Sequence, residues 1–354
     1  MFQEFVINFT LEPRLTVGQK YQKITNAGSL RQLYLDVSED PHDTAFSCLT
    51  DDRGKKVFAC HKKHGVEMLV LGEENYPKAL LALERPPLTL YCKGKSIPAA
   101  ETLLSVIGTR RPSHYGKRIA SKIVSELVQA GIGIVSGLAR GIDGIAHKAA
   151  VDHFGYTLVV LAHGFHQVYP PEHRKLFAQI LEAGGTIVSE YPWGVGPMTH
   201  HFRDRNRINA ALGSGILVVE AGKKSGTKIT VHEGLLLNKE IYSIPGPIDS
   251  PMSQYPNELI RDGAWMAYDA QMILGHFGKV KEAQEKVNAV FQSPLEKTLV
   301  QYLDVDEPRS IETFCVQYAE FMIRDIMVTL SDFECRGIVD RISDGRYVLT
   351  SRYM

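Results

Sequence analysis

The sequence lacks the features that mark several specialised classes of protein. Its five cysteines, in 354 residues, are odd in number and form no Cys-x-x-Cys pair, which argues against a disulfide framework or a zinc site. No apolar run approaches the roughly 20 residues that a membrane-spanning helix needs. The N-terminus also lacks the basic start and cleavage site of a signal peptide. We therefore expect a cytoplasmic protein with reduced thiols and no membrane association.

A net charge is absent as well. The 40 basic residues balance 40 acidic ones, so any surface that binds nucleic acid must be a local patch. A hydrophobic content of 44% is enough for a sizeable core. A chain of this length usually divides into two or three domains.

A strand, turn and helix pattern occurs twice between Leu103 and Ala149. Leu103–Ile107 is a short apolar run that ends at a glycine, as expected for a parallel strand buried on both faces. Apolar residues then recur at helical spacing until Gly131 ends the helix, and a second unit begins at Ile132. Four later strands are expected at 157–162, 186–189, 215–219 and 240–244. This alternation predicts an α/β fold with a doubly wound, Rossmann-like parallel sheet.

Both glycine turns of this pattern carry arginine. The residues are Gly108, Thr109, Arg110, Arg111 and Ser113 in the first turn, and Gly137, Arg140 and Gly141 in the second. In a parallel sheet both turns lie at one edge, where helix N-termini offer free N–H groups to an anion. Arginine can also hold a phosphate with two hydrogen bonds. The pattern therefore predicts a phosphate-binding edge, although Gly137 alone could equally serve only a tight turn.

Common nucleotide sites fit this sequence poorly. The first turn is not Gly-x-Gly-x-x-Gly, and the strand that ends at Ser136 has no acidic residue for a ribose hydroxyl, which argues against NAD. The segment from Gly222 to Thr227 lacks the spacing of a P-loop, which argues against ATP hydrolysis. We expect no cofactor and no metal, because four histidines (163, 166, 200 and 201) lack ligand spacing.

Two further segments add candidates for phosphate binding. The first supplies Lys224, Ser225, Gly226 and Thr227. The second places Arg203, Arg205 and Arg207 at i, i+2 and i+4, so at most two of them share a helix face. We assign Arg203 or Arg207 to the nucleic acid and Arg205 to the structure.

Eight sequence blocks follow in a fixed order from Ser105 to Ala264. They are SVIGTRRPSHYG, IVSGLARGIDGIAH, VYPPEHRKLF, IVSEYPWG, FRDRNRINAALG, LVVEAGKKSGTKIT, IPGPID and NELIRDGA. Together they resemble the DNA-processing protein A family, also called DprA or Smf. The resemblance implies a homodimeric protein without known catalysis that binds single-stranded DNA and loads the RecA recombinase onto it in natural transformation and DNA recombination. By match of motif, the DNA would contact the Gly108–Ser113 turn, Arg140 with its flanking glycines, and Lys224–Thr227.

The regions that flank the expected Rossmann-like domain (96–277) show no electrostatic bias toward DNA. Residues 1–95 indicate a helical N-terminal domain, in which Gly18 belongs to a degraded helix-hairpin-helix. A turn-rich lead-in follows from Met68 to Gly94. Residues 1–95 contain thirteen basic and twelve acidic residues. A polar linker (278–292) precedes a winged-helix pattern (293–354) with eleven acids and seven bases. DNA affinity begins with phosphate neutralisation. We favour structural or protein-interaction roles for both ends, with DNA contact as the alternative.

An enzyme remains the alternative function for the central domain. Related Rossmann-like proteins cleave nucleotide phosphoribosyl bonds, and acidic side chains could act there as paired acid and base. The candidates are Asp143, Glu190, Asp204, Glu220 and Glu233. We favour a binding protein because no nucleophile can be placed beside a base and because Asp143 is positioned to cap a helix. Tyr169, Tyr191 and Trp193 lie in loops, where they could stack on bases or pack into turns.

Overall fold

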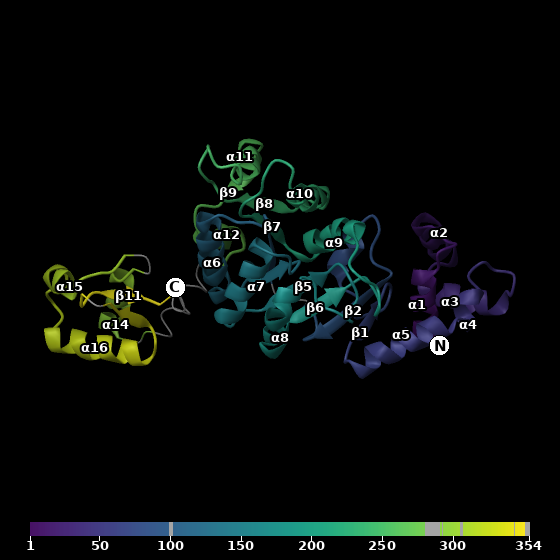
Figure 1. The fold of residues 1–354 in the computed structure, drawn as a ribbon, viewed down its shortest axis with the longest axis horizontal. Coiled ribbons are helices and arrows are strands. Elements are labelled where there is room, and N and C mark those ends of the chain that lie inside the picture. The colour runs from purple at the N-terminus through teal and green to yellow at the C-terminus, as the bar shows by residue number, and fades with distance from the viewer. Residues whose placement is uncertain (99–101, 280–290, 292, 305–306, 343, 351–354) are drawn as a thin grey trace.

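The computed structural model describes residues 1–98, 102–279, 291, 293–304, 307–342 and 344–350. Most of the expected linker, residues 280–290 and 292, lies outside the described residues. Figure 1 shows the helical N-terminal segment, the central sheet and the C-terminal segment in chain order along the longest axis. None of the helices in the described ranges combines the length and apolar character that a membrane crossing requires.

Nine strands form one sheet in the order β1-β2-β6-β5-β4-β3-β7-β8-β9. Their bounds are β1 Glu67–Val70, β2 Thr89–Gly94, β3 Leu103–Ile107, β4 Gly133–Ser136, β5 Thr157–Leu161, β6 Thr186–Ser189, β7 Gly215–Val218, β8 Glu240–Ser243 and β9 Trp265–Met266. Neighbours from β6 to β9 are parallel. The doubly wound, Rossmann-like fold is confirmed, and the six expected strands are present with bounds shifted by no more than one residue.

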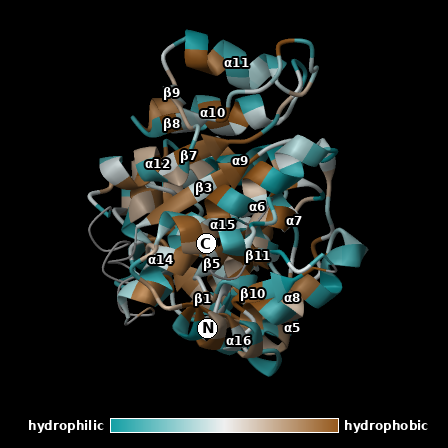
Figure 2. Cartoon of the chain, turned by 90° about the vertical axis from the view of Figure 1, so that its left-hand side faces the viewer, coloured by the Kyte–Doolittle hydropathy of each residue, from teal (hydrophilic) through white to brown (hydrophobic). Residues whose placement is uncertain are grey.

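Helices cover the sheet in two layers (Figures 1 and 2). One layer holds α12 Ala270–His276, α6 His114–Gln129, α7 Ile142–Asp152 and α8 Arg174–Glu182, with the short η2 Pro171–His173 before α8. The other holds α9 Thr199–Leu212, α10 Thr227–Leu236 and η1 Lys78–Ala82, while α11 Gln254–Arg261 lies beside β8. Alternate residues of β3 face the two layers: Val106 packs in the core formed with α6 and α7, whereas Ile107 packs in the core formed with α9 and α10.

The direction in which the sheet is built reverses beside β3. The chain runs from β3 through β4 and β5 to β6 on one side, then returns through α9 to place β7 on the other side of β3. Ligands of open α/β sheets bind at such a reversal, at the carboxyl ends of the strands. The carboxyl ends of β3 and β7 lead into Gly108 and Glu220, so the first glycine turn opens at this point.

The segment expected as a turn-rich lead-in, Met68 to Gly94, belongs to the sheet instead. β1 pairs with β2, and β2 pairs with β6, both antiparallel. Buried apolar side chains on both strands, such as Leu69 and Leu90, join the core under η1 and explain the pairing. The many turn residues of this segment lie between the two strands. The expected boundary near residue 95 therefore falls after two strands of the sheet.

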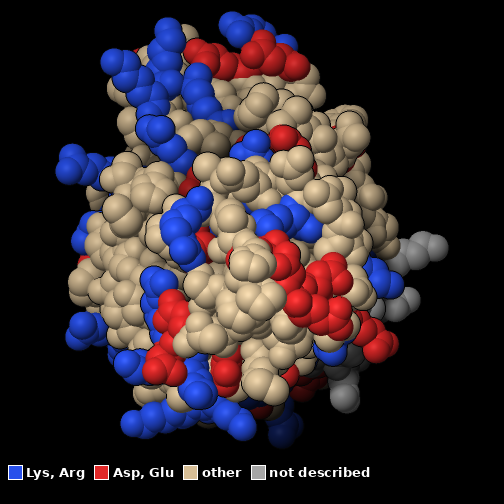
Figure 3. Space-filling view, turned by 90° about the vertical axis from the view of Figure 1, so that its right-hand side faces the viewer, with Lys and Arg blue, Asp and Glu red and all other residues tan. Residues whose placement is uncertain are grey.

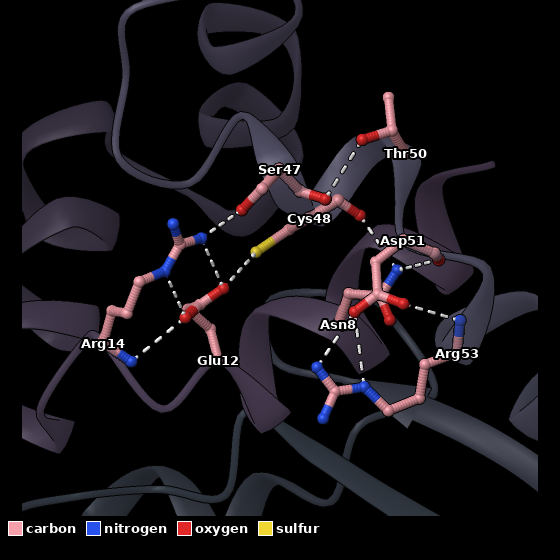
Figure 4. A network of polar contacts seen from close by, with 8 residues as sticks. All are labelled: Asn8, Glu12, Arg14, Ser47, Cys48, Thr50, Asp51 and Arg53. Atoms are coloured by element: carbon pink, nitrogen blue, oxygen red, sulfur yellow. Dashed lines mark hydrogen bonds and ion pairs between the residues drawn. The ribbon is translucent and has the colours of Figure 1, made fainter.

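The N-terminal segment consists of five helices. They are α1 Phe2–Leu11, α2 Val17–Ala27, α3 Leu30–Glu39, α4 Ser47–Thr50 and α5 Asp52–Lys63. Gly18 lies in the first turn of α2, which Thr16 caps. A polar network fixes α4 and α5 on α1 (Figure 4): the Asn8 amide donates to the Asp51 carbonyl (2.7 Å), and the Glu12 carboxylate accepts two hydrogen bonds from the Arg14 guanidinium and one from its backbone N–H. That pairing lowers the pKa of Glu12 to about 2.

The C-terminal segment contains the expected elements in the expected order. Three helices, α14 Pro294–Tyr302, α15 Ile311–Gln317 and α16 Ile323–Cys335, precede the antiparallel pair β10 Val339–Arg341 and β11 Tyr347–Leu349. Gly345 takes a left-handed backbone conformation (φ +84°) at the hairpin turn. The C-terminal segment has its own hydrophobic core, which includes Phe314, Leu330 and Phe333.

Candidate nucleic-acid interface

The two glycine turns lie against each other at the carboxyl edge of the sheet. The Ile142 N–H donates to the Thr109 carbonyl at 3.2 Å, and Gly141 approaches that carbonyl so closely that a Cβ would lie 2.3 Å from it. Gly141 also has a positive φ of +77°. Both facts require glycine at position 141. The expected meeting of the two turns at one edge is thus present in the structure.

The first turn is fixed by Glu220, which follows β7. Its carbonyl accepts from the Thr109 N–H (2.6 Å), and its buried carboxylate accepts from the Ser113 N–H (2.9 Å) and hydroxyl (2.5 Å). The Ser113 hydroxyl in turn accepts from the Gly116 N–H and caps α6. Ser113 and Glu220 therefore hold the turn in place. Neither lines the cavity whose wall includes Gly108, Thr109, Arg110 and Arg111.

The second turn is fixed by Asp143. Its carboxylate accepts from the N–H groups of Gly137 (3.2 Å) and Ala139 (3.4 Å). We expected Asp143 to cap α7, but Gly141 occupies the N-cap position and the carboxylate reaches back to the loop instead. Burial raises the pKa of Asp143, although Arg205 and the two N–H groups oppose the shift. Gly137 packs on the same arginine, and a Cβ there would lie 1.4 Å from the Arg205 guanidinium.

A cavity of about 890 Å³ opens where the sheet reverses, between the first turn, α9 and the start of α10. Five basic side chains and one acidic side chain line it. Nine of the residues predicted from sequence lie on its wall: Gly108, Thr109, Arg110, Arg111, Arg203, Lys224, Ser225, Gly226 and Thr227. Arg110 and Arg111 also line a second cavity of about 590 Å³, which includes Gly141, Lys117 and Lys148. The two arginines therefore separate two adjoining hollows with basic walls.

The three arginines of α9 have different surroundings. Arg203 is exposed and lines the cavity. Arg205 is 4% exposed and donates to the Val160 carbonyl (2.8 Å), which agrees with the structural role that we assigned to it. Arg207 points elsewhere and pairs with Glu190 at 2.5 Å. Of the two arginines proposed for nucleic acid, the geometry therefore favours Arg203.

Arg140, in the second turn, pairs with Glu172 in η2 through both carboxylate oxygens. It is absent from the cavity walls formed by Arg110 and Arg111. The pair is about half exposed, so solvent weakens it. The second turn thus shows an arginine that already has an anionic partner within the chain.

Aromatic rings add a second character to the large cavity. The Arg110 guanidinium lies 5.5 Å from the centre of the Phe202 ring, and this ring lies 5.7 Å from that of Tyr169. Tyr169 and Phe202 both line the cavity, where they could stack on bases. The other two loop aromatics pack within the protein: Tyr191 contacts His201, and Trp193 contacts His64.

Sequence patterns missed part of the α9 contribution. Thr199, Phe202, Asn206 and Asn209 line the cavity with Arg203. Their spacing of i, i+3, i+4, i+7 and i+10 places them on one helix face. The alternating arginines are the more obvious pattern in this segment. The helical spacing of the five residues is the signal that predicts this polar face.

Three of the five acidic side chains offered for catalysis are engaged with neighbouring groups. Asp143 and Glu220 hold the two turns, and Glu190 pairs with Arg207. Burial raises the pKa of Glu190, while Arg207 opposes that shift. Asp204 is exposed on α9, outside the cavity wall, and Glu233 lies on α10, also outside it.

Comparison with known proteins addresses the family directly. The model of the family "DNA recombination-mediator protein A" matches residues 67–278, which are the sheet and its helices. The chain belongs to this family. The resemblance that the eight sequence blocks indicated is therefore confirmed.

Protein Smf of Escherichia coli is 41% identical over 201 residues, 57% of this chain and 54% of that protein. DNA processing protein DprA of Bacillus subtilis is 34% identical over 218 residues, 60% of this chain and 73% of that protein. The matched part is thus only about half of the E. coli protein.

Two solved structures of family members share the fold. One is DNA processing protein A from Helicobacter pylori, described for its single-stranded DNA binding mode; it is 30% identical, with a TM-score of 0.55, over 60% of this chain and 96% of that one. The other is DprA from Streptococcus pneumoniae, at 27% identity and a TM-score of 0.59 over 78% of this chain and 93% of that one. Both support the family assignment at the level of structure.

Proposed function

We propose that this member of the DNA recombination-mediator protein A family binds single-stranded DNA in the cavity at the sheet reversal. The observation that carries the proposal is the wall of this cavity, which combines five basic side chains with one acid that the second turn already holds. Phosphates supply the charge that such a wall lacks. The single-stranded DNA binding mode of the H. pylori relative supports the same ligand.

The cavity contains separate groups for the backbone and for the bases of a strand. Arg110, Arg111 and Arg203 present exposed guanidinium groups that suit phosphate oxygens. Tyr169 and Phe202 present rings on which unpaired bases can stack. Duplex DNA stacks its bases internally, so the rings favour a single strand. Since backbone and ring contacts tolerate any base, binding should depend little on sequence.

The family resemblance carries the wider role. We propose that the bound strand is passed to the RecA recombinase during recombination and natural transformation, and that the protein acts as a binding protein. The engaged states of Asp143, Glu190 and Glu220 support binding over the cleavage of nucleotides. Incubation with nucleoside monophosphates should accordingly release no free base.

We also propose a homodimer that forms through the end of the sheet. Trp265, Met266 and Tyr268 on and after the edge strand β9 are 47%, 47% and 68% exposed. An exposed apolar edge strand favours pairing with a second copy. Light scattering at micromolar concentration should report twice the 39.5 kDa of one chain.

The decisive experiment compares matched single- and double-stranded oligonucleotides at two salt concentrations. We expect tighter binding of the single strand and an affinity that falls as salt rises, by about 0.7 log units per log unit of salt for each phosphate contact. Equal affinity for the two forms would reject the ring contacts. Affinity that does not respond to salt would reject the basic wall.

A further inference from the structure

Four lysines form a ridge on α5, far along the chain from the cavity. Lys55, Lys56, Lys62 and Lys63 are all exposed. Seven residues make almost two helical turns, so Lys62 lies above Lys55 and Lys63 above Lys56 on one face of the helix. We call these four residues the α5 ridge. Among the residues that the structure describes, none of the four forms an ion pair with an acid.

The opposite face of α5 is fixed against α1. A Cβ on Gly54 would lie 2.4 Å from the Glu4 carbonyl, so the two helices touch at their backbones. Asp51 caps α5 by accepting from the Arg53 N–H (2.8 Å), and Asn8 holds the Asp51 carbonyl (Figure 4). The ridge therefore points into solvent from a helix whose orientation the packing determines.

The C-terminal end of the ridge meets an aromatic platform. The His64 ring stacks on the Trp193 ring with centres 4.4 Å apart and an interplanar angle of 18°. The backbone N–H of Trp193 donates to His61 Nε2 at 2.9 Å, which ties the loop after β6 to α5. Trp193 is partly exposed. Lysines beside a partly exposed indole are the combination that single-stranded nucleic acid uses on other proteins.

The same loop leads to the cavity. Thr199, at the start of α9, lines the cavity only six residues after Trp193. Six residues of chain span at most about 20 Å. One loop thus has the ring platform near its beginning and the cavity wall at its end, so a strand that leaves the cavity along it would reach the α5 ridge.

The balanced charge count of residues 1–95 conceals this ridge because several acids of the segment lie on another helix. Asp36, Glu39 and Asp40 are exposed on α3 and directly after it. Figure 3 shows basic side chains along the lower edge of this end of the molecule, the level at which α5 lies in Figure 1. A segment without net charge can therefore still present a basic surface.

From these observations we infer that the α5 ridge and the His64–Trp193 stack form a second contact for the single strand held in the cavity. The inference rests on the proposed function and extends the footprint of the strand onto the N-terminal helices. Phosphates contact the lysines and a base stacks on the exposed part of the Trp193 ring. An acidic protein would complement the lysines but would make no specific use of the indole.

The test compares a short strand of about 6 nucleotides with a long strand of about 30 nucleotides, both oligo-dT. The variant replaces Lys55, Lys56, Lys62 and Lys63 by glutamine, which retains helix propensity on the exposed face. The matched control removes the same charge elsewhere through Lys122→Gln, Lys279→Gln, Lys297→Gln and Arg324→Gln. We expect the ridge variant to lose at least tenfold affinity for the long strand, with a salt slope smaller by up to about 2.8, at about 0.7 per contact. Affinity for the short strand should stay within about twofold.

A spectroscopic arm follows the ring platform directly. The chain has two tryptophans, so Trp265→Phe leaves Trp193 as the reporter. The long strand should quench its fluorescence and the short strand should not. Equal long-strand affinity in the ridge and control variants, or no quenching by the long strand, overturns the inference while short-strand binding still supports the cavity. If neither strand binds the unmodified protein, the proposed function fails and the second contact fails with it.

Discussion

The two glycine turns have the same sequence signature and different surroundings. Arg110 and Arg111 are exposed in the first turn, line two hollows and form no ion pair within the described residues. Arg140 in the second turn is held by Glu172. Gly137 lies against the buried Arg205. The difference teaches that glycine and arginine close together in the sequence predict where a turn lies. The residues that surround the turn decide whether its arginine is free to bind a phosphate.

The largest effect should come from the first turn. Arg110→Ala together with Arg111→Ala removes two guanidinium groups that each contribute about 1.5 to 3 kcal/mol to a charge-assisted contact. We expect at least a hundredfold loss of single-strand affinity at low salt, since about 1.4 kcal/mol is a factor of ten. The salt slope should become smaller by about 1.4, at about 0.7 per contact.

Lysine at the same two positions is the control for charge alone. It restores the positive charge without the planar fork that grips two oxygens, so it should recover only part of the affinity. The salt slope should return more completely than the affinity. An unchanged slope in an alanine variant that remains folded by circular dichroism would mean that these arginines do not contact phosphate.

A substitution in the second turn should first lower the stability of the fold. Gly137→Ala inserts a methyl group where a Cβ would lie 1.4 Å from the Arg205 guanidinium, so Arg205 must move and its hydrogen bond to the Val160 carbonyl is disturbed. We expect a loss of about 1 to 3 kcal/mol in the free energy of unfolding, measured by denaturant titration. Gly226→Ala is the matched control, because a Cβ there meets open space. A Gly137 variant as stable as this control would place Arg205 in a looser site than the structure shows.

Periodicity predicted the fold well because it depends on local burial. The six parallel strands alternate with helices, and each buried strand is a short apolar run, such as Leu103–Ile107, that needs no knowledge of its neighbours. The strands β1 and β2 were missed because the segment between them contains Gly72 and three prolines (77, 86 and 87), which indicate turns. Only the core that Leu69 and Leu90 share with residues distant in the chain reveals that these two strands join the sheet.

The site was predicted as far as it depends on chain order. Parallel topology brings the turns at Gly108 and Gly141 to one edge, so their meeting could be expected from the sequence. The pairs Arg140 with Glu172 and Arg207 with Glu190 join residues 32 and 17 positions apart in the chain. No local pattern predicts such pairs, which is why Arg140, and Arg207 as an alternative to Arg203, were expected to contact the nucleic acid.

Loss of the second-turn arginine should have a small effect on binding. The side chain that Arg140→Ala removes is already paired with Glu172, so the substitution removes little binding energy for a phosphate. We expect single-strand affinity within about threefold of the unmodified protein and a salt slope that changes by less than about 0.7. A loss as large as that of the Arg110 and Arg111 variant would show that Arg140 exchanges Glu172 for phosphate, and that the two turns act alike.

The smallest expected effect reverses the sign of the others. Glu172→Gln keeps the size of the side chain and removes the charge that holds Arg140, so the freed guanidinium can turn toward a phosphate. An exposed ion pair is worth about 0 to 1 kcal/mol, so the gain in single-strand affinity at low salt should be no more than about fivefold, with a slope steeper by up to about 0.7. Glu182→Gln, an exposed acid on α8, removes the same charge without touching Arg140 and serves as the control. Combining Arg140→Ala with Glu172→Gln should abolish the gain, because only the arginine can turn the lost acid into a new contact. If the double variant keeps the gain, the effect is general loss of negative charge near the edge, and the pairing of Arg140 with Glu172 does not explain why the two turns differ.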